Sequence, residues 1–321
     1  MAAVTPQPGV VLLNMGGPDT SADIEPFLHR VLADPMLIRL PAGFLWQWLF
    51  ARLVSKRRAR KVATRYEQIG GGSPLLAETR HLASALAKRL DMPVSIGMRY
   101  SNPGAATAIE QLEQRGVNTI VALPLYPQYS GSTTASSLAD LKHHLPSAMQ
   151  MTVISRHGQA PKFLQTLASQ INQALQDSTP ETALLFTAHS IPVAYSRNGD
   201  PYIHEVERTV EGIVPLLTHP VAWRLGYQSS TRFGTWHGPD LNEVLSELKA
   251  KGFTNLVVQP VTFASENLET RFDLDIVLKN NALAMGFTAP IRLPAPGRNQ
   301  LYIETLSELV RDHLTTKVNT Q

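Results

Sequence analysis

The sequence predicts an α/β protein made of doubly wound parallel sheets in two similar halves. Short apolar runs alternate with helix-periodic segments, which is typical of parallel strands covered by helices. The apolar run Gly9–Met15 ends in Gly16-Gly17-Pro18, as a buried parallel strand that leads into a loop does. Two stretches, Ile109–Tyr129 and Val244–Ser265, match in order: a helix, a Gly turn, a Pro-containing apolar strand and a polar loop with an aromatic residue. This match indicates an internal duplication.

The remaining elements follow from the same periodicities. After the first strand, the first half is predicted to contain helices over Asp23–Leu32, Glu78–Leu90 and Gly104–Arg115, and strands over Val94–Met98 and Thr119–Leu125. The second half is predicted to contain strands over Ala183–Phe186, Ala222–Gly226 and Asn255–Val261, and helices over Tyr202–Leu217 and Leu241–Lys251.

The repeat also predicts where the chain crosses between its halves. A helix from Ser132 leads into a strand over Met151–Ser155, and a helix from Thr270 leads into a strand over Pro290–Leu293. We expect each helix to carry the chain into the other half. Residues 1–131 and 288–321 would then form an N-terminal lobe, and residues 132–287 a C-terminal lobe.

Ligands of open α/β sheets bind beyond the carboxyl ends of the strands. Two duplicated halves therefore predict a ligand cleft between them. Its expected lining consists of the residues that follow the strands: Met15, Arg99, Tyr126–Ser130, His189, Gln228 and Phe263–Glu269.

The amino-acid composition limits the size of the domains and the kinds of site that the chain can form. The 321 residues are 43% hydrophobic, which is enough for one large α/β domain or two of ordinary size. The net charge of +3 says little about partners, whereas the lack of cysteine excludes disulfides, zinc–thiolate sites and cysteine-ligated iron–sulfur clusters. No secretory signal precedes the first strand, and no apolar run approaches the ~20 residues of a membrane span. We therefore expect a cytoplasmic protein.

His189 is the candidate proton acceptor. It follows an apolar strand at the carboxyl end, where an imidazole can pass a proton, hold a metal or simply cap a loop. Further along, Glu266, Glu269 and Asp273 would share one face of a helix. Such a face can carry protons to solvent or guide a cation inward, and the alternative is an ordinary charged helix N-terminus.

Three other segments have candidate functions. The basic run Lys56–Lys61 can hold carboxylates through paired arginine donors, or form a solvated helix face; it lacks the interleaved aromatics of a nucleic-acid site. The neighbouring run Phe44–Val54 is apolar enough either to touch a membrane or to be a core helix. The run Gly70–Ser73 lacks the spacing of a phosphate-binding loop, so a nucleotide site is rejected.

A series of motifs, in the same order along the chain, resembles the ferrochelatase family. They are Leu13–Pro18, Tyr66 with Ile69–Pro74, Gly97–Tyr100, Leu125–Ser130, Thr187–Pro192, Gly199–Tyr202, Trp236–Pro239 and Phe263–Thr270. The resemblance implies two Rossmann-like lobes with four-stranded parallel sheets, related by pseudo-twofold symmetry around a porphyrin cleft. It implies a lyase that inserts Fe²⁺ into protoporphyrin IX, forms protohaem and releases two protons. Iron is then a substrate, and no cofactor is permanently bound.

The resemblance also assigns roles to residues of this chain. His189 and Glu269 are the catalytic and metal-handling pair, and Glu266 and Asp273 form a proton or metal path. The porphyrin contacts are Met15, Arg58, Tyr66, Ser73, Arg99, Tyr129, Gln228, Trp236 and Phe263. Two departures stand out: the family usually has Asp and His where this chain has Glu266 and Asn267, and many members have Cys at the Gly131 position. The lack of that Cys fits a bacterial enzyme without an iron–sulfur cluster.

Three alternatives stay open at this point. Coproporphyrin is the rival substrate, although members that use it tend to carry Tyr at the Met15 position. A cobalt or nickel chelatase for an earlier tetrapyrrole would share the fold, and a porphyrin- or haem-binding protein would not need Glu269. The expected partners are the porphyrin and ferrous iron, with no nucleic acid. A peripheral contact with the inner face of the membrane, and a transient contact with the preceding enzyme of haem synthesis, complete the expectations.

Overall fold

The computed structural model describes residues 8–38, 43–230 and 234–318. Within them, the strands form two four-stranded sheets, and every neighbouring pair of strands is parallel. The chain divides into two compact units. The first comprises Met1–Tyr126, Ser130–Arg156 and Ile303–Gln321, and the second comprises Pro127–Tyr129 and His157–Tyr302.

The first sheet has the spatial order β2-β1-β3-β4. Its strands are β1 (Pro8–Asn14), β2 (Val94–Met98), β3 (Thr119–Pro124) and β4 (Gln150–Val153). Alternate side chains of the central strand β1 serve opposite faces. Val11 and Leu13 pack against α4 (Ala105–Glu113) and α5 (Ser136–His143). Asn14, on the other face, donates to Thr79 of α3 (Leu75–Leu90) at 3.2 Å.

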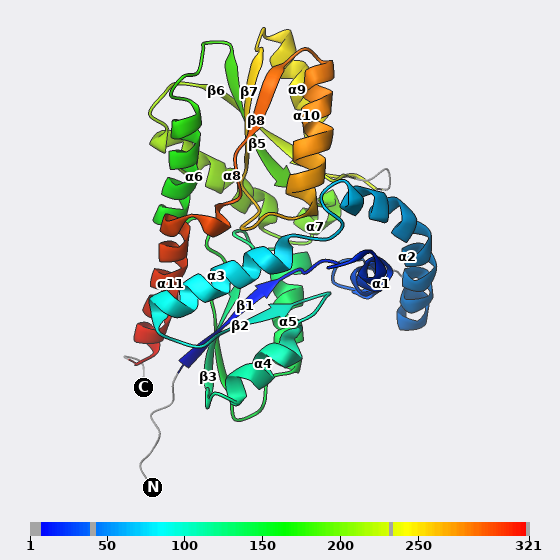
Figure 1. Cartoon of the computed structure of the whole chain (residues 1–321), viewed down its shortest axis with the longest axis vertical. Helices are drawn as coiled ribbons and strands as arrows, with labels where there is room; N and C mark the ends of the chain where they lie inside the picture. Colours follow the sequence, from blue (N-terminus) through cyan, green and yellow to red (C-terminus); the bar gives the residue numbers. More distant parts are fainter. Residues whose placement is uncertain (1–7, 39–42, 231–233, 319–321) are drawn as a thin grey trace. The chain divides into compact units, whose positions relative to one another are not determined.

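The first unit contains further helices. They are η1 (Ser21–Asp23), α1 (Ile24–Ala33), α2 (Gly43–Glu67), the π-helix η2 (Gly131–Ala135) and α11 (Gln300–Val318), which joins this unit from Ile303. α11 lies beside α3, where Arg89 pairs with Glu304 at 3.4 Å (Figure 1). α2 packs on α1, and Gln47 donates to the Leu32 carbonyl at 2.7 Å. Among the described residues, no helix combines the length and apolar character needed to span a bilayer.

The second sheet has the order β6-β5-β7-β8. Its strands are β5 (Thr182–His189), β6 (Ala222–Gln228), β7 (Asn255–Pro260) and β8 (Thr288–Arg292). On one face, Ala183 and Leu185 of β5 pack against α9 (Leu241–Ala250), the π-helix η4 (Glu269–Leu278) and α10 (Lys279–Ala284). The remaining helices are α6 (Pro161–Ala174), α7 (Val193–Arg197), α8 (Tyr202–Ile213), η3 (Val214–Leu216) and η5 (Pro296–Arg298) (Figure 1).

The two sheets have the same topology, which confirms the two four-stranded parallel sheets expected from the sequence. In each sheet the first strand along the chain is central, with the second strand on one side and the third and fourth on the other. The likeness extends to helix winding, because each third strand is followed by a π-helix, η2 in one unit and η4 in the other. The pseudo-twofold relation and the cleft between the halves stay predictions.

The predicted lobe boundaries are wrong: the chain changes units after Arg156 and after Tyr302, and not at residues 131 and 287. The fourth strand does not cross over: β4 pairs with β3 from Thr119↔Gln150 onward, and β8 pairs with β7 from Asn255↔Thr288 onward. Each fourth strand thereby satisfies its backbone hydrogen bonds within its own sheet. Only the following helices change units, so α6 belongs to the second unit and α11, from Ile303, to the first.

Candidate functional site

His189 is the last residue of β5, and the alternation of that strand fixes its direction. Ala183 and Leu185 face α9 and η4, so Thr187 and His189 point to the same side of the sheet. The His189 backbone is held at both ends: its amide donates to Thr262 Oγ1 at 3.4 Å, and its carbonyl accepts from the Tyr202 hydroxyl at 2.9 Å. The ring is thus carried by a fixed strand end.

Glu269 is the first residue of η4, and the winding of this helix decides where it faces. In a π-helix, residues five apart are hydrogen-bonded neighbours along the axis. Glu269 therefore lies on the stripe of Leu274 and Leu278, which are buried against the sheet. In an α-helix the nine steps from residue 269 to residue 278 would make about two and a half turns and place the ends of this stripe on opposite faces. The side chain of Asn267 caps the helix, accepting from the Glu269 amide at 2.8 Å.

The two side chains form a pair. Nδ1 of His189 lies 2.7 Å from Oε2 of Glu269. The same oxygen accepts hydrogen bonds from Nε2 of Gln228 and from Oγ of Ser229, both at 2.9 Å. The side chains of His189 and Glu269 are 38% and 26% exposed, so a substrate or a proton can reach them.

Electrostatics favours the charged form of both partners. Burial opposes ionisation of Glu269, but the adjacent His189 and the donors of Ser229 and Gln228 keep its pKa below the usual value. Burial likewise opposes a charge on His189, yet Glu269, helped by Asp273, raises the pKa of the imidazole. The pair can therefore take up a proton and stabilise it as an imidazolium beside a carboxylate.

The second unit brings together part of the predicted set. Gln228, at the end of β6, contacts Glu269 directly. Trp236 forms an isolated antiparallel β-bridge with Pro192. Phe263 and Tyr129 are half-buried and lie beyond strand ends. The Tyr129 amide donates to the Glu205 carboxylate at 2.8 Å. Sequence reasoning missed Ser229, which has a positive φ of 66° directly after β6. Its position next to Gln228, at a strand end, is the signal that could have found it.

Glu266 does not join Glu269 and Asp273 on the predicted acidic face. Glu266 precedes η4 and its carboxylate is buried, where it accepts from Arg292 and the Thr270 hydroxyl, both at 2.6 Å. Burial opposes its ionisation, but Arg292 and Thr270 lower its pKa. The face was expected from α-helical spacing, which does not apply to Glu266 because it lies before the helix begins. Asp273 lies within η4 and still acts on His189 by its charge.

In the first unit, the loop that contains Met15 and Gly17 approaches Ser73 and the end of α2, which carries Tyr66. Met15 follows β1 directly, and the Ser73 amide donates to the Pro18 carbonyl at 2.8 Å. A Cβ atom at Gly17 would lie 2.6 Å from Ser73 and 3.8 Å from the Tyr66 hydroxyl. Only glycine fits this close approach. Arg58 lies on an exposed part of α2.

The Arg99 side chain is part of a hydrogen-bond network in the first unit. Its guanidinium donates to Asp34 and to Oγ of Ser136, both at 2.8 Å. Asp34 is buried and also accepts from the Tyr100 hydroxyl at 2.7 Å. A buried carboxylate without such donors would be costly, so Arg99 is needed to hold Asp34 in place.

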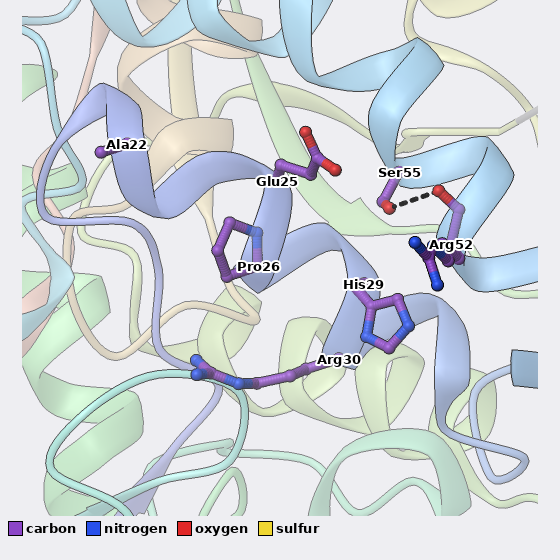
Figure 2. Close-up of a pocket in the computed structure, with 7 residues that line it drawn as sticks. All are labelled: Ala22, Glu25, Pro26, His29, Arg30, Arg52 and Ser55. Carbon is purple, nitrogen blue, oxygen red and sulfur yellow. Dashed lines mark hydrogen bonds between the residues drawn. The ribbon is translucent and has the colours of Figure 1, made fainter.

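A separate cavity of about 550 Å³ lies between α1 and α2. Its lining consists of Ala22, Glu25, Pro26, His29, Arg30, Arg52 and Ser55. Figure 2 shows Arg52 and His29 facing each other across it. None of the residues predicted for the site lines this cavity.

Comparisons with known proteins agree on one family. A family model described as Ferrochelatase matches residues 7–314. A curated ferrochelatase of Synechococcus sp. (strain JA-3-3Ab) is 40% identical, covering 96% of this chain and 94% of the relative. That of Aquifex aeolicus (strain VF5) is 35% identical, covering 95% of this chain and 99% of the relative.

Solved structures share the fold at low identity. The structure described as SirB from Bacillus subtilis with Fe³⁺ has a TM-score of 0.56 at 13% identity, and the match covers 96% of this chain and 95% of that one. The sirohydrochlorin chelatase SirB from Bacillus subtilis subspecies spizizenii, in complex with cobalt, has a TM-score of 0.52 at 12% identity, with the same coverage. The predicted chelatase-like fold class is thus confirmed.

Proposed function

The chain belongs to the ferrochelatase family, lyases that insert ferrous iron into a porphyrin, and we propose that its porphyrin is protoporphyrin IX. The product is then protohaem, with two protons released. The choice of substrate is supported by Met15, an apolar residue directly after β1. It is also supported by the apolar side chains on α2, among which Leu45, Trp46 and Leu53 are 73%, 60% and 64% exposed. Apolar surface suits a porphyrin that carries two vinyl groups and only two propionates.

The observation that carries the chemistry is the contact between His189 and Glu269. With Glu269 ionised and His189 neutral, Nδ1–H of His189 donates to Oε2, and the other ring nitrogen, Nε2, keeps its lone pair. We assign Nε2 as the acceptor of a pyrrole N–H proton. Glu269 stabilises the imidazolium that forms, and Asp273 adds to that stabilisation. Metallation releases two pyrrole protons while iron gains four Fe–N bonds, so His189 passes its proton on and acts twice.

The same pair can handle the metal. An imidazole nitrogen and a carboxylate oxygen are both suitable ligands for Fe²⁺. The side chains of His189 and Glu269 are 38% and 26% exposed, so the ion can reach them. Iron is a substrate here, so a weak two-residue site is sufficient for its delivery. Glu266 is not assigned to this path, because its carboxylate is held by Arg292.

The first unit supplies the groups that hold the porphyrin substituents. Arg58 offers a paired set of donors to a propionate, with Ser73 and Tyr66 beside the loop that follows β1. The decisive experiment compares kcat/KM for Fe²⁺ insertion into protoporphyrin IX and into coproporphyrin III under anaerobic conditions. A higher value for protoporphyrin IX supports the proposal. A higher value for coproporphyrin III assigns the chain to the other substrate.

We also propose that the first part of α2 touches the membrane. Leu45, Trp46 and Leu53 are among its exposed apolar side chains, and the exposed Lys56 and Arg57 lie one turn further along the helix. The Phe44 side chain, predicted as part of this segment, lies outside the described residues. Apolar side chains next to basic ones favour attachment to an anionic bilayer. A poorly soluble substrate could then be taken up directly from the lipid.

A further inference from the structure

The π-helix that carries Glu269 requires support from outside the helix. π-Winding occurs mostly as single turns, whereas η4 is π-wound over ten residues, Glu269–Leu278. Its winding determines whether Glu269 lies on the stripe of Leu274 and Leu278 or turns away from His189. Whatever stabilises this winding therefore also positions Glu269.

Arg292 holds the helix on both sides of Glu269. Its Nε and one terminal nitrogen donate to the two oxygens of Asp275, at 2.8 Å and 2.6 Å. Its other terminal nitrogen donates to Oε1 of Glu266 at 2.6 Å. One planar guanidinium thus joins a residue just before the helix to a residue in its middle. Return to α-winding would carry Asp275 around the helix axis, away from the position that Arg292 fixes.

The base of this clamp is rigid. Arg292 is the last residue of β8, is paired with Val258 of β7, and has a side chain that is only 10% exposed. Glu266 is fixed further by the Ala295 amide at 3.0 Å and the Thr270 hydroxyl at 2.6 Å. Thr270 is the residue after Glu269. The contacts therefore run from the sheet through Arg292 and Glu266 to the residue next to Glu269.

Arg271 provides a natural comparison within the same network. It approaches Glu266 at 3.5 Å and Asp275 at 3.7 Å, but its side chain is 50% exposed. Exposed ion pairs at such distances contribute little. Arg271 carries the same charge to the same two carboxylates without the short bonds and without an anchor in the sheet.

We propose that Arg292 is a positioning residue for iron insertion, acting by fixing the winding of η4 so that Glu269 faces His189. The proposal rests on the proposed role of Glu269. Arg292→Lys keeps the positive charge and removes the planar fork, so it can fold while it loosens the clamp. A displacement of about 1 Å at a reacting group can cost roughly a hundredfold in rate.

The test measures metal insertion into protoporphyrin IX with Arg292→Lys, Arg271→Lys and Glu269→Gln, each alone, and with Arg292→Lys combined with Glu269→Gln. Arg292→Lys is expected to lower kcat by about ten- to a hundredfold with little change in the KM for porphyrin. Arg271→Lys should leave both near their parent values. In the Glu269→Gln background, Arg292→Lys should lower kcat little further, because it acts through Glu269.

The possible outcomes distinguish failure of the proposed role of Glu269 from failure of the positioning role of Arg292. If Glu269→Gln keeps the parent rate, the proposed role of Glu269 fails. If Glu269→Gln is inactive but Arg292→Lys keeps the parent kcat, the positioning role of Arg292 is wrong. Equal losses of kcat from Arg292→Lys in both backgrounds would show a general structural effect and also overturn the proposal. Asp275→Asn, which weakens the other end of the fork, should repeat the pattern of Arg292→Lys.

Discussion

Oε2 of Glu269 lies 2.7 Å from Nδ1 of His189, although the two residues are 80 positions apart in the chain. His189 ends β5, the first strand of the second sheet along the chain. Glu269 begins η4, the helix that follows the third strand, β7. The parallel sheet brings these two positions to the same edge. The contact fixes which ring nitrogen of His189 remains available to a substrate.

Replacement of either partner should abolish most metallation without loss of porphyrin binding. His189→Ala and Glu269→Gln are each expected to lower the rate of metal insertion by about 10²- to 10⁴-fold, the usual contribution of general acid–base groups. The double variant should be little worse than the worse single one, because both serve one step. Porphyrin binding is checked by fluorescence titration and insertion by formation of zinc or iron porphyrin. His189→Ala that inserts iron at nearly the parent rate would remove the central assignment.

Arg58 should affect affinity more than chemistry. Arg58→Ala leaves one propionate without its paired donor, and loss of a charged hydrogen bond typically costs about 1.5–3 kcal/mol. The KM for porphyrin should rise roughly tenfold or more while kcat changes little. Arg60→Ala, in the same basic run, is the matched control and should leave KM unchanged. An effect on kcat alone would show that Arg58 does not hold a propionate.

Attachment to vesicles should depend on α2 and on salt. Each basic residue near an anionic surface contributes about 1 kcal/mol, and this attraction is screened by salt. Co-sedimentation with phosphatidylserine-containing vesicles should therefore fall as salt rises, and Trp46→Ser should weaken it at low salt. Leu283→Ser, on the exposed surface of α10, is the control and should bind as the parent does. Parent protein that stays in solution at low salt would contradict the membrane contact.

Acid should destabilise the second unit through His157. This side chain is buried, contacts the Tyr302 hydroxyl at 2.9 Å, and has its pKa lowered by burial to about 3. A lowered pKa in the folded state means that the unfolded chain binds the proton more readily. The contribution of neutral His157 to the free energy of unfolding is fully present above about pH 6.5. It is lost as the pH falls from there towards 3, by at most about 1.4 kcal/mol per pH unit.

The prediction for His157 is checked by urea unfolding at pH 7, 6 and 5. His157→Gln is expected to be less stable than the parent at pH 7, since it loses buried packing, but to show a shallower decline with acid. His219→Gln, at an exposed position, should follow the parent curve. If the His157→Gln decline is as steep as that of the parent, another group is responsible for the acid sensitivity.

The sequence by itself determined the fold class and the family, and it predicted His189 and Glu269, which the structure brings into contact, as site residues. The apolar run Gly9–Met15, bounded by Gly16-Gly17-Pro18, is typical of a buried parallel strand, and β1 covers Pro8–Asn14. The strand predicted over Ala183–Phe186 extends to His189, which lies at its carboxyl end as expected. The order of short motifs along the chain pointed to the family that the comparisons show. The same resemblance predicted Gln228 as a site residue, and its side chain contacts Glu269.

Tertiary structure decided the features that depend on partners far away in the chain. α-Helical spacing placed Glu266 beside Glu269, but Glu266 lies before η4 begins and is held by Arg292, 26 residues away. Arg99 was expected to bind the substrate, yet it pairs with the buried Asp34, 65 residues away. The lobe boundaries were misplaced because the pairing of β4 with β3 satisfies backbone groups that no local pattern reveals. Local periodicity specifies an element, whereas its winding, partners and charge balance depend on the residues against which it packs.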